Sequence, residues 1–184
     1  MVKIIVFLGN PGAEYRDTRH NIAWQMADRL SFAGGLDWQA KFKGVYASYP
    51  IGRIKYIFLK PTTFMNRAGE SVRALCQFFK IDAQEVLVVH DDLELEFGRF
   101  FVKKGGGLGG HNGLRSVASA LGSRDFYRFR LGISRPAHDN VSGYVLGKFT
   151  PSERLDLDYF LDSAAKALEE CLYMDIDEAV RRFG

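Results

Sequence analysis

The sequence has few cysteines and no pattern that ties them to chemistry. Cys76 and Cys171 are the two cysteines of the 184-residue chain, and no CxxC pair or Cys/His ligand spacing accompanies them. The sequence therefore indicates neither a disulfide framework nor a zinc site. Both cysteines lie in stretches with helical apolar spacing, which is typical of buried thiols in a reducing compartment. We expect a cytoplasmic protein.

Long apolar runs are also missing. No stretch approaches the roughly 18 consecutive apolar residues that a membrane-spanning helix requires. Residues 4–8 form an apolar run near the N-terminus, but it leads straight into Gly9-Asn10-Pro11-Gly12 without the small-residue site at which a signal peptide is cleaved. We therefore expect a soluble protein, with no membrane partner, whose first segment is a buried strand.

Several motifs of catalysis and cofactor binding are absent. The chain has no GxSxG nucleophile elbow and no GxxxxGK[ST] phosphate loop. A metal site would have to use His90, Asp91, Asp92 and Glu94. Because neighbouring residues of a strand point to opposite faces, these four side chains cannot all face one ion. The sequence predicts neither a metal nor a cofactor.

What the chain does contain is typical of one globular domain. Hydrophobic residues make up 47% and charged residues 26% of the sequence, and no linker or repeat divides it. We predict a single domain over residues 1–184. The net charge is only +3, but residues 96–135 are rich in Lys and Arg whereas residues 150–184 are acidic. This asymmetry fits a basic face for a polyanion, or an uneven surface, and charge alone leaves both open.

Apolar spacing predicts alternating strands and helices. The predicted strands cover residues 4–8, 42–49, 53–59, 86–89, 99–103 and 129–134, and the predicted helices cover residues 22–32, 67–80, 112–121 and 150–172. The second and third strands flank a short turn and are predicted to pair antiparallel. The fold class is therefore α/β: a single-domain twisted mixed β-sheet with helices packed on both faces. In such folds ligands bind beyond the carboxyl ends of the strands.

Two residues suggest acid–base chemistry. His20 precedes a predicted helix, and histidine is the natural general base near neutral pH. Asp91 follows a predicted strand, where its carboxylate can orient an imidazole. Each signal is weak alone, since most histidines are structural and Asp91 with Asp92 also suits a loop. A His–Asp pair without a protein nucleophile would act on water.

The glycine-rich residues 105–113 are the most unusual stretch. They formally contain GxGxxG between a strand and a helix, which leaves a nucleotide-dependent oxidoreductase as one alternative, although no second strand with a terminal acidic residue follows. Lys103 and Arg130 flank the stretch and are suited to phosphate contacts. Tyr15 and Phe64 are candidates for stacking on a base, and a core position for Phe64 is equally compatible with the sequence.

Taken together, the motifs resemble the bacterial-type peptidyl-tRNA hydrolases over nearly the whole chain. The matching stretches are residues 8–12, Tyr15, residues 18–21, 60–66, 89–93, 105–113 and 129–133. Several long motifs in the right order make this resemblance specific. One departure is Leu108, which stands where many relatives carry a polar residue or histidine.

The resemblance implies a hydrolase that cleaves the ester between a peptide and the 3′ ribose of tRNA and so recycles tRNA. It implies that His20 is the catalytic base, that Asp91 supports it, and that Asn10 also belongs to the catalytic set. The residues that it implies for substrate and tRNA binding are Tyr15, Phe64, Asn66, Asn112, His111, Lys103 and Arg130.

This chemistry agrees with the residue types. An ester needs an activated water and donors for the developing oxyanion, and asparagine amides supply such donors. We expect the partner to be peptidyl-tRNA, contacted at its 3′ end and acceptor stem, and the protein to act as a monomer. The alternative from another class is a noncatalytic RNA-binding module on the same fold.

Overall fold

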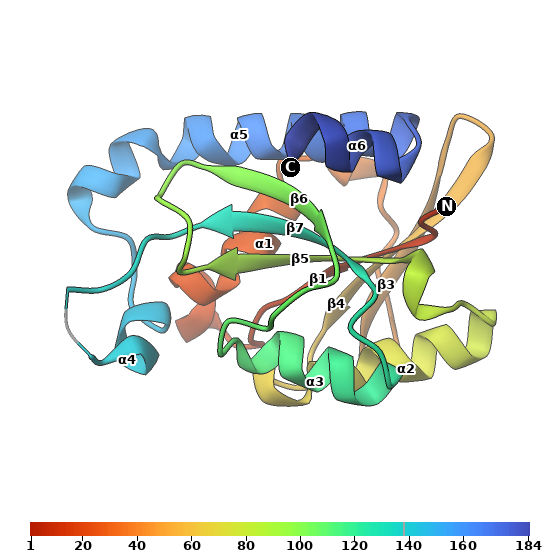
Figure 1. Cartoon of the computed structure of the whole chain (residues 1–184), viewed down its shortest axis with the longest axis horizontal. Coiled ribbons are helices and arrows are strands. Elements are labelled where there is room, and N and C mark those ends of the chain that lie inside the picture. The colour runs from red at the N-terminus through yellow and green to blue at the C-terminus, as the bar shows by residue number, and fades with distance from the viewer. Residues whose placement is uncertain (138) are drawn as a thin grey trace.

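A seven-stranded mixed sheet organises the chain in the computed structural model, which describes residues 1–137 and 139–184. The strand order is β2-β3-β4-β1-β5-β7-β6 (Figure 1). The strands are β1 (Ile4–Phe7), β2 (Gln39–Lys41), β3 (Gly44–Ile51), β4 (Ile54–Pro61), β5 (Val86–Asp92), β6 (Phe100–Lys104) and β7 (Tyr127–Gly132). The central strands β4, β1, β5 and β7 are parallel, and β2, β3 and β6 add antiparallel edges. The predicted mixed α/β sheet is confirmed.

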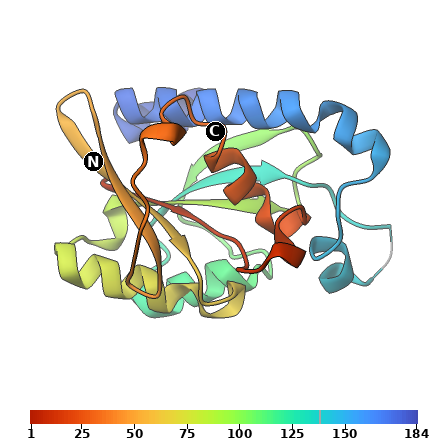
Figure 2. The same cartoon turned by 180° about the vertical axis from the view of Figure 1, so that it is seen from behind.

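Helices cover both faces of the sheet, as predicted (Figure 1). One face is covered by α1 (Ile22–Ala27), α5 (Pro151–Tyr173) and α6 (Ile176–Phe183), and the other by α2 (Ala68–Phe79) and α3 (Asn112–Leu121). The short helix α4 (Val141–Val145) lies beyond the end of the sheet. Seen from behind, α1 crosses the sheet beneath α5 (Figure 2). None of the helices in the described residues combines the length and apolar composition of a membrane span.

The central strands have continuous apolar sequences, without alternating polar residues, because both faces of the sheet are covered by apolar cores. In β1, Ile5 and Phe7 pack into the core under α1 and α5, whereas Ile4 and Val6 pack into the core over α2 and α3. Every residue of this strand is buried. A strand covered on both faces loses the polar alternation of a half-exposed strand.

The longest helix begins as the sequence predicts. Thr150 accepts a hydrogen bond from the backbone N–H of Glu153, and the Glu153 side chain accepts one from the backbone N–H of Thr150. Pro151 occupies the first helical position, where its missing N–H has no helical partner to lose. This capping box starts α5 beside the functional site.

Three boundaries differ most from the predictions. The helix predicted over residues 22–32 ends at Ala27: the N–H groups of Arg29 and Leu30 bond carbonyls three residues back, and Glu169 of α5 accepts the backbone N–H and the hydroxyl of Ser31. The strand predicted over residues 86–89 continues to Asp92, because His90, Asp91 and Asp92 pair with β7. The strand predicted over residues 129–134 is displaced to Tyr127–Gly132. The edge strand β2 and the helix α6 were not predicted.

Candidate active site

A cavity of about 470 Å³ lies beyond the carboxyl ends of the central strands. Its walls come from five separate parts of the chain: the segments that follow β1 and β4, the end of β5, the glycine-rich loop, and α4. The lining includes Asn10, His20, Phe64, Met65, Asn66, Asp91, Leu108, His111, Asn112, Val141 and Val145. The convergence that the sequence predicted at this edge of the sheet is therefore present.

The centre of the cavity is a buried histidine–aspartate pair. His20 lies in a 3-10 turn before α1, and its Nδ1 is 2.9 Å from both carboxylate oxygens of Asp91. Both side chains are buried. Because Nδ1 of His20 is hydrogen-bonded to Asp91, Nε2 is the ring nitrogen that remains free.

The charges of this pair are set by competing effects. Burial alone would raise the pKa of Asp91, but the neighbouring histidines and their hydrogen bonds hold it well below its usual range. Burial alone would lower the pKa of His20, but the charge of Asp91 and its hydrogen bond raise that pKa above the ordinary 6.5. Asp91 is therefore ionised at neutral pH and stabilises an imidazolium at His20.

A second histidine shares the same carboxylate. Nε2 of His111 lies 2.8 Å from Oδ1 of Asp91, while its Nδ1 accepts the backbone N–H groups of Gly113 and Leu114 at 3.1 and 3.3 Å. An acceptor at Nδ1 requires that Nε2 carries the proton, so neutral His111 donates to Asp91. Both ring nitrogens of His111 are thus used within the protein, although the side chain lines the cavity.

The asparagines predicted from the sequence surround the pair in different environments. Asn10 is buried, and its Oδ1 accepts the backbone N–H of Met65 at 2.7 Å, which leaves its NH2 group as the part that remains for a ligand. Asn21 was not predicted as a site residue, yet its side chain accepts the N–H of Asn10 and donates to the carbonyl of Asn10, both at 2.9 Å. Asn66 and Asn112 are exposed on the cavity wall.

Two aromatic residues mark the rim. Phe64 is 52% exposed and adopts a positive φ of 62°, a strained conformation for a bulky residue. Tyr15 packs edge-on against it, with ring centroids 6.2 Å apart. The core position that the sequence left open for Phe64 is excluded by this exposure.

The two basic residues predicted to contact phosphate lie outside the cavity. Lys103 is exposed on β6, and Arg130 on β7 donates to Asp92 at 2.7 Å. Neither residue lines the cavity, although Asp92, the partner of Arg130, does. The predicted residues therefore form an inner group around His20 and an outer group on β6 and β7.

The residues considered as metal ligands from the sequence have other hydrogen-bond partners in the structure. His90 bonds the backbone carbonyl of Asp91, Asp92 accepts from Arg130, and Glu94 accepts from Arg135. Among the described residues, His20, Asp91 and His111 are the one group of three potential ligands close enough to share an ion, with ligand atoms within 4.8 Å of one another. Their spacings are those of hydrogen bonds, and a metal on Nε2 of His111 would displace the proton that the helix contact fixes there.

The geometry also disfavours a dinucleotide site at the glycine-rich loop. Such sites bind pyrophosphate with the free N–H groups at the start of the following helix. Here the N–H groups of Gly113 and Leu114 donate to Nδ1 of His111, so they are not free to bind a phosphate. Leu108 packs against the core over α2 and α3 and forms part of the cavity wall.

A buried arginine that was not predicted as a site residue, Arg19, holds the His20 segment in place. Arg19 donates to the carbonyl of Lys148 and to the carboxylate of Glu153, both at 2.7 Å. Its guanidinium stacks over the ring of Tyr144, 4.1 Å from the centroid. These contacts connect the histidine to α4 and to the capping box of α5, and only its position beside His20 signalled them in the sequence.

Comparison with known proteins identifies one family. The sequence model of the peptidyl-tRNA hydrolase family matches residues 4–184. The chain is 42% identical over 185 residues to a peptidyl-tRNA hydrolase of Bacillus cytotoxicus, with 100% of both chains covered. It is 49% identical over 157 residues to one from Treponema pallidum, covering 83% of this chain and 78% of that relative.

Solved structures give the same result. The crystal structure of peptidyl-tRNA hydrolase from Acinetobacter baumannii superposes with a TM-score of 0.87 at 35% identity, covering 98% of this chain and 93% of that one. A family match over nearly the whole chain, close relatives at full length and a shared fold lead to one conclusion: the chain belongs to the peptidyl-tRNA hydrolase family.

Proposed function

We propose that this hydrolase cleaves the ester bond between a peptide, or an N-blocked aminoacyl group, and the 3′ ribose of tRNA. The observation that carries the proposal is the His20–Asp91 pair at the base of a cavity lined by asparagine amides. Cys76 and Cys171 are buried in the helices α2 and α5, and burial raises the pKa of each thiol to about 12. Water is therefore the nucleophile that the base activates.

His20 performs both proton transfers in this mechanism. Its Nδ1 proton stays on the hydrogen bond to Asp91, and Nε2 takes a proton from the attacking water. The hydroxide adds to the ester carbonyl, and the C–O bond to the ribose then breaks. The imidazolium returns its proton to the departing 3′ oxygen, so charge and protons balance. Asp91 stabilises the transient imidazolium without becoming protonated.

The asparagines supply the neutral hydrogen-bonding groups. The NH2 group of Asn10 is held in place by two contacts, to Met65 through Oδ1 and to Asn21 through the backbone. Such a preorganised donor stabilises a tetrahedral oxyanion better than a mobile one. Asn66 and Asn112 offer both donors and acceptors, which suits the amide bonds that distinguish a peptidyl or N-blocked group from a free aminoacyl group.

The outer residues suit the tRNA part of the substrate. Phe64 and Tyr15 present aromatic surface at the rim, on which the bases of the 3′ end stack. Lys103 and Arg130 face the acceptor stem and contact its phosphates. We propose that the protein acts as a monomer in the cytoplasm, and the two buried thiols are compatible with that reducing compartment.

The decisive experiment is release of N-acetyl-aminoacyl groups from tRNA by the purified protein, compared with unblocked aminoacyl-tRNA. We expect rapid release from the blocked substrate alone and loss of that release in His20→Ala. Binding of tRNA by the variant, measured at several salt concentrations, serves as the control for folding. If the wild-type protein binds tRNA but releases nothing, it is the noncatalytic RNA-binding module.

A further inference from the structure

Arg19 is a buried cation directly beside the proposed base, and the proposed mechanism does not use it. It precedes His20 in the same 3-10 turn and is 5% exposed. Its NH1 group donates to the carbonyl of Lys148 at 2.7 Å and to that of Tyr144 at 3.4 Å, and its NH2 group donates to Glu153 at 2.7 Å. These partners lie 125 or more residues away in the chain. The turn that carries the base is therefore attached to one distant segment.

The backbone of this turn is joined to the same segment. The N–H of Arg19 donates to the carbonyl of Gly147 at 3.0 Å, and Thr18 pairs with Lys148 in an isolated antiparallel bridge. A Cβ on Gly147 would lie 3.4 Å from NH1 of Arg19, so the two segments are in contact. Side-chain and backbone contacts together hold the turn and the segment that follows α4 as one unit.

The helix α4 at the start of that segment is a wall of the cavity. Val141 and Val145 of α4 line the cavity, as does Leu146 directly after it. Val141 is 36% and Leu146 is 42% exposed, so this α4 wall presents apolar surface to a ligand. An apolar acyl side chain that covers this surface gains free energy by leaving water. The wall that such a side chain contacts is thus attached to the unit that holds the base.

Tyr144 connects the α4 wall to Arg19. The guanidinium lies over its ring, 4.1 Å from the centroid. A planar guanidinium stacks on a ring while its edge still donates hydrogen bonds, which the compact charge of an ammonium does not do. The hydroxyl of Tyr144 donates to the carbonyl of Ile133, directly after β7, so the ring cannot turn away without breaking that bond. A shift of α4 is therefore transmitted through Tyr144 and Arg19 to His20.

We infer that Arg19 is a positioning residue that couples the α4 wall to His20, so that an acyl side chain packed on this wall places the base for attack on the ester. The inference rests on the proposed function, because it concerns the acyl group of that reaction. Catalysis is sensitive to such placement, since a displacement of about 1 Å costs on the order of 10²-fold in rate. The side chain next to the ester should therefore affect kcat, and this effect should require Arg19.

The coupling is tested with N-acetyl-leucyl and N-acetyl-glycyl esters of one tRNA at saturating concentration. We expect kcat of the wild-type protein to be roughly tenfold higher for the leucyl ester, which covers the α4 wall, than for the glycyl ester, which does not. Arg19→Lys keeps the charge beside Glu153 but loses the stacked, planar fork. In this variant the ratio of the two kcat values should fall to about one, with a much smaller change in KM. Equal kcat on the two esters in the wild-type protein, or an unchanged ratio in the variant, would overturn the coupling.

Arg154→Gln is the matched control for loss of an arginine contact to the same segment. Arg154 is exposed and donates to the carbonyl of Phe149 at 3.0 Å, between α4 and α5. We expect this variant to keep the wild-type ratio of kcat values on the two esters. A purely structural role of Arg19 predicts a lower Tm and an equal loss of kcat on both esters, and that result would overturn the assignment.

Tyr144→Leu removes the stacked ring and tests the same connection from the side of α4, also in the event that Arg19→Lys does not fold. We expect the same loss of the leucyl preference. The double variant with Arg19→Lys should lose no more than either single variant, because both substitutions interrupt one connection. Losses that add in the double variant would show two independent effects and would overturn the coupling.

The imidazole resonances of His20 provide a readout that does not depend on catalysis. The protein is titrated with analogues of N-acetyl-leucyl-adenosine and N-acetyl-glycyl-adenosine in which an amide replaces the ester. We expect the two ligands to give different shifts at the His20 ring in the wild-type protein and the same shifts in Arg19→Lys. Identical shifts with both ligands bound to the wild-type protein overturn the inference. Wild-type release of N-acetyl-aminoacyl groups from tRNA tests the proposed function separately.

Discussion

At the scale of single residues, two histidines converge on one carboxylate, and each depends on a different ring nitrogen. His20 uses Nδ1 to bind Asp91 and keeps Nε2 for the reaction, whereas His111 uses Nε2 for Asp91 and Nδ1 for the start of α3. The carboxylate therefore accepts two donors that are fixed by separate parts of the chain. This arrangement defines the tautomer of both rings without any contact to substrate.

Asp91→Asn removes the charge while preserving the shape of the side chain. The amide of the new residue can donate to Nδ1 of His20, which moves the ring proton to Nε2 and removes the base. We expect kcat to fall by about 10³-fold or more on N-acetyl-aminoacyl-tRNA. The matched control is Asp92→Asn, since Asp92 contacts Arg130 instead, and we expect that variant to retain most of kcat. Similar losses in the two variants would argue against a specific role for Asp91.

The same pair determines the expected pH dependence. The reaction needs neutral His20, and Asp91 raises the pKa of His20 above 6.5. Activity should therefore be lost as the pH falls through that raised pKa and should reach a plateau above it. In Asp91→Asn the residual activity should show a midpoint at lower pH, because burial then acts on His20 without the compensating charge. Profiles of kcat/KM against pH check this, and an unchanged midpoint would contradict it.

At the scale of elements, the site depends on how closely α2 and α3 pack. The backbone N–H of Gly69 on α2 donates to the hydroxyl of Ser116 on α3 at 2.9 Å. A Cβ on Gly69 would lie 2.1 Å from the carbonyl oxygen of Ser116, a distance that requires the helices to separate. Because α3 begins beside His111 and Asn112, this contact helps to set the position of the cavity wall.

Gly69→Ala should therefore affect both stability and the site. We expect a loss of about 1–3 kcal/mol in the free energy of unfolding, the usual range for an overpacked contact, measured by urea denaturation. Gly34→Ala is the matched control, because nothing lies within 4 Å of a Cβ there and its φ is not positive. If the two variants unfold at the same urea concentration, the close approach of the helices is not rigid.

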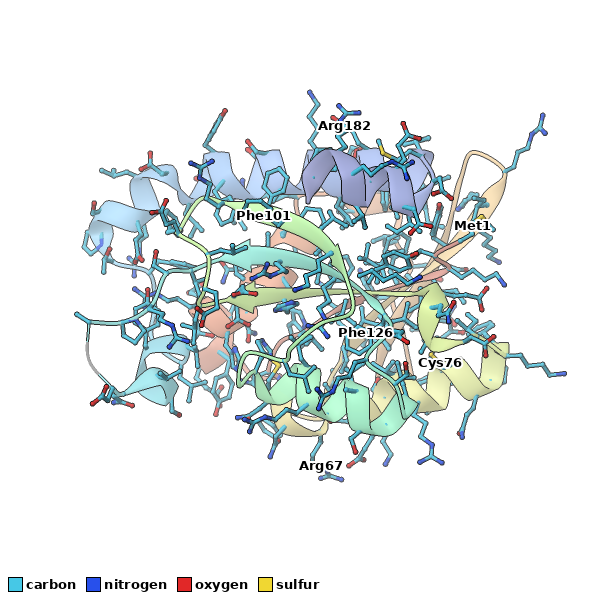
Figure 3. All side chains as sticks on the ribbon, viewed as in Figure 1. Met1, Arg67, Cys76, Phe101, Phe126 and Arg182 are labelled. Carbon is cyan, nitrogen blue, oxygen red and sulfur yellow. The ribbon has the colours of Figure 1, made fainter. Side chains whose placement is uncertain are left out.

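At the scale of the whole molecule, one continuous sheet separates two apolar cores. Cys76 on α2 (Figure 3) lies in the core on one face, and Cys171 on α5 lies in the core on the other. Both thiols are buried, and each has its pKa raised to about 12. The two cysteines are therefore natural reporters on opposite layers of the fold.

This placement predicts the reactivity of the native protein. At pH 8 the thiols are almost fully protonated and inaccessible, so we expect no reaction with a disulfide reagent on the timescale in which a free thiol reacts. In increasing urea both thiols should become reactive together, because the shared sheet couples the two cores. Cys76→Ala and Cys171→Ala assign the signals. Reaction of one thiol well before the other would show that the two layers unfold separately.

Much of the fold and the inner site was predictable from local patterns. The apolar runs located the central strands, and Thr150 and Glu153 predicted the start of α5. The positions of Asn10 and Asp91 just after two predicted strands, 4–8 and 86–89, predicted that they lie near one another. These predictions succeed because burial on two faces, helix capping and strand direction are properties of a few neighbouring residues.

The tertiary structure alone decided how these pieces contact one another. It ended α1 at Ala27, it joined Ser31 to Glu169 of α5, and it placed Arg19 between His20 and the capping box. It also gave His111 two partners inside the protein and stacked Arg19 on Tyr144 of α4. The sequence by itself determined which residues carry the chemistry, because residue type sets charge and hydrogen-bonding capacity. Their partners come from segments far away in the chain, so only packing in three dimensions could select them.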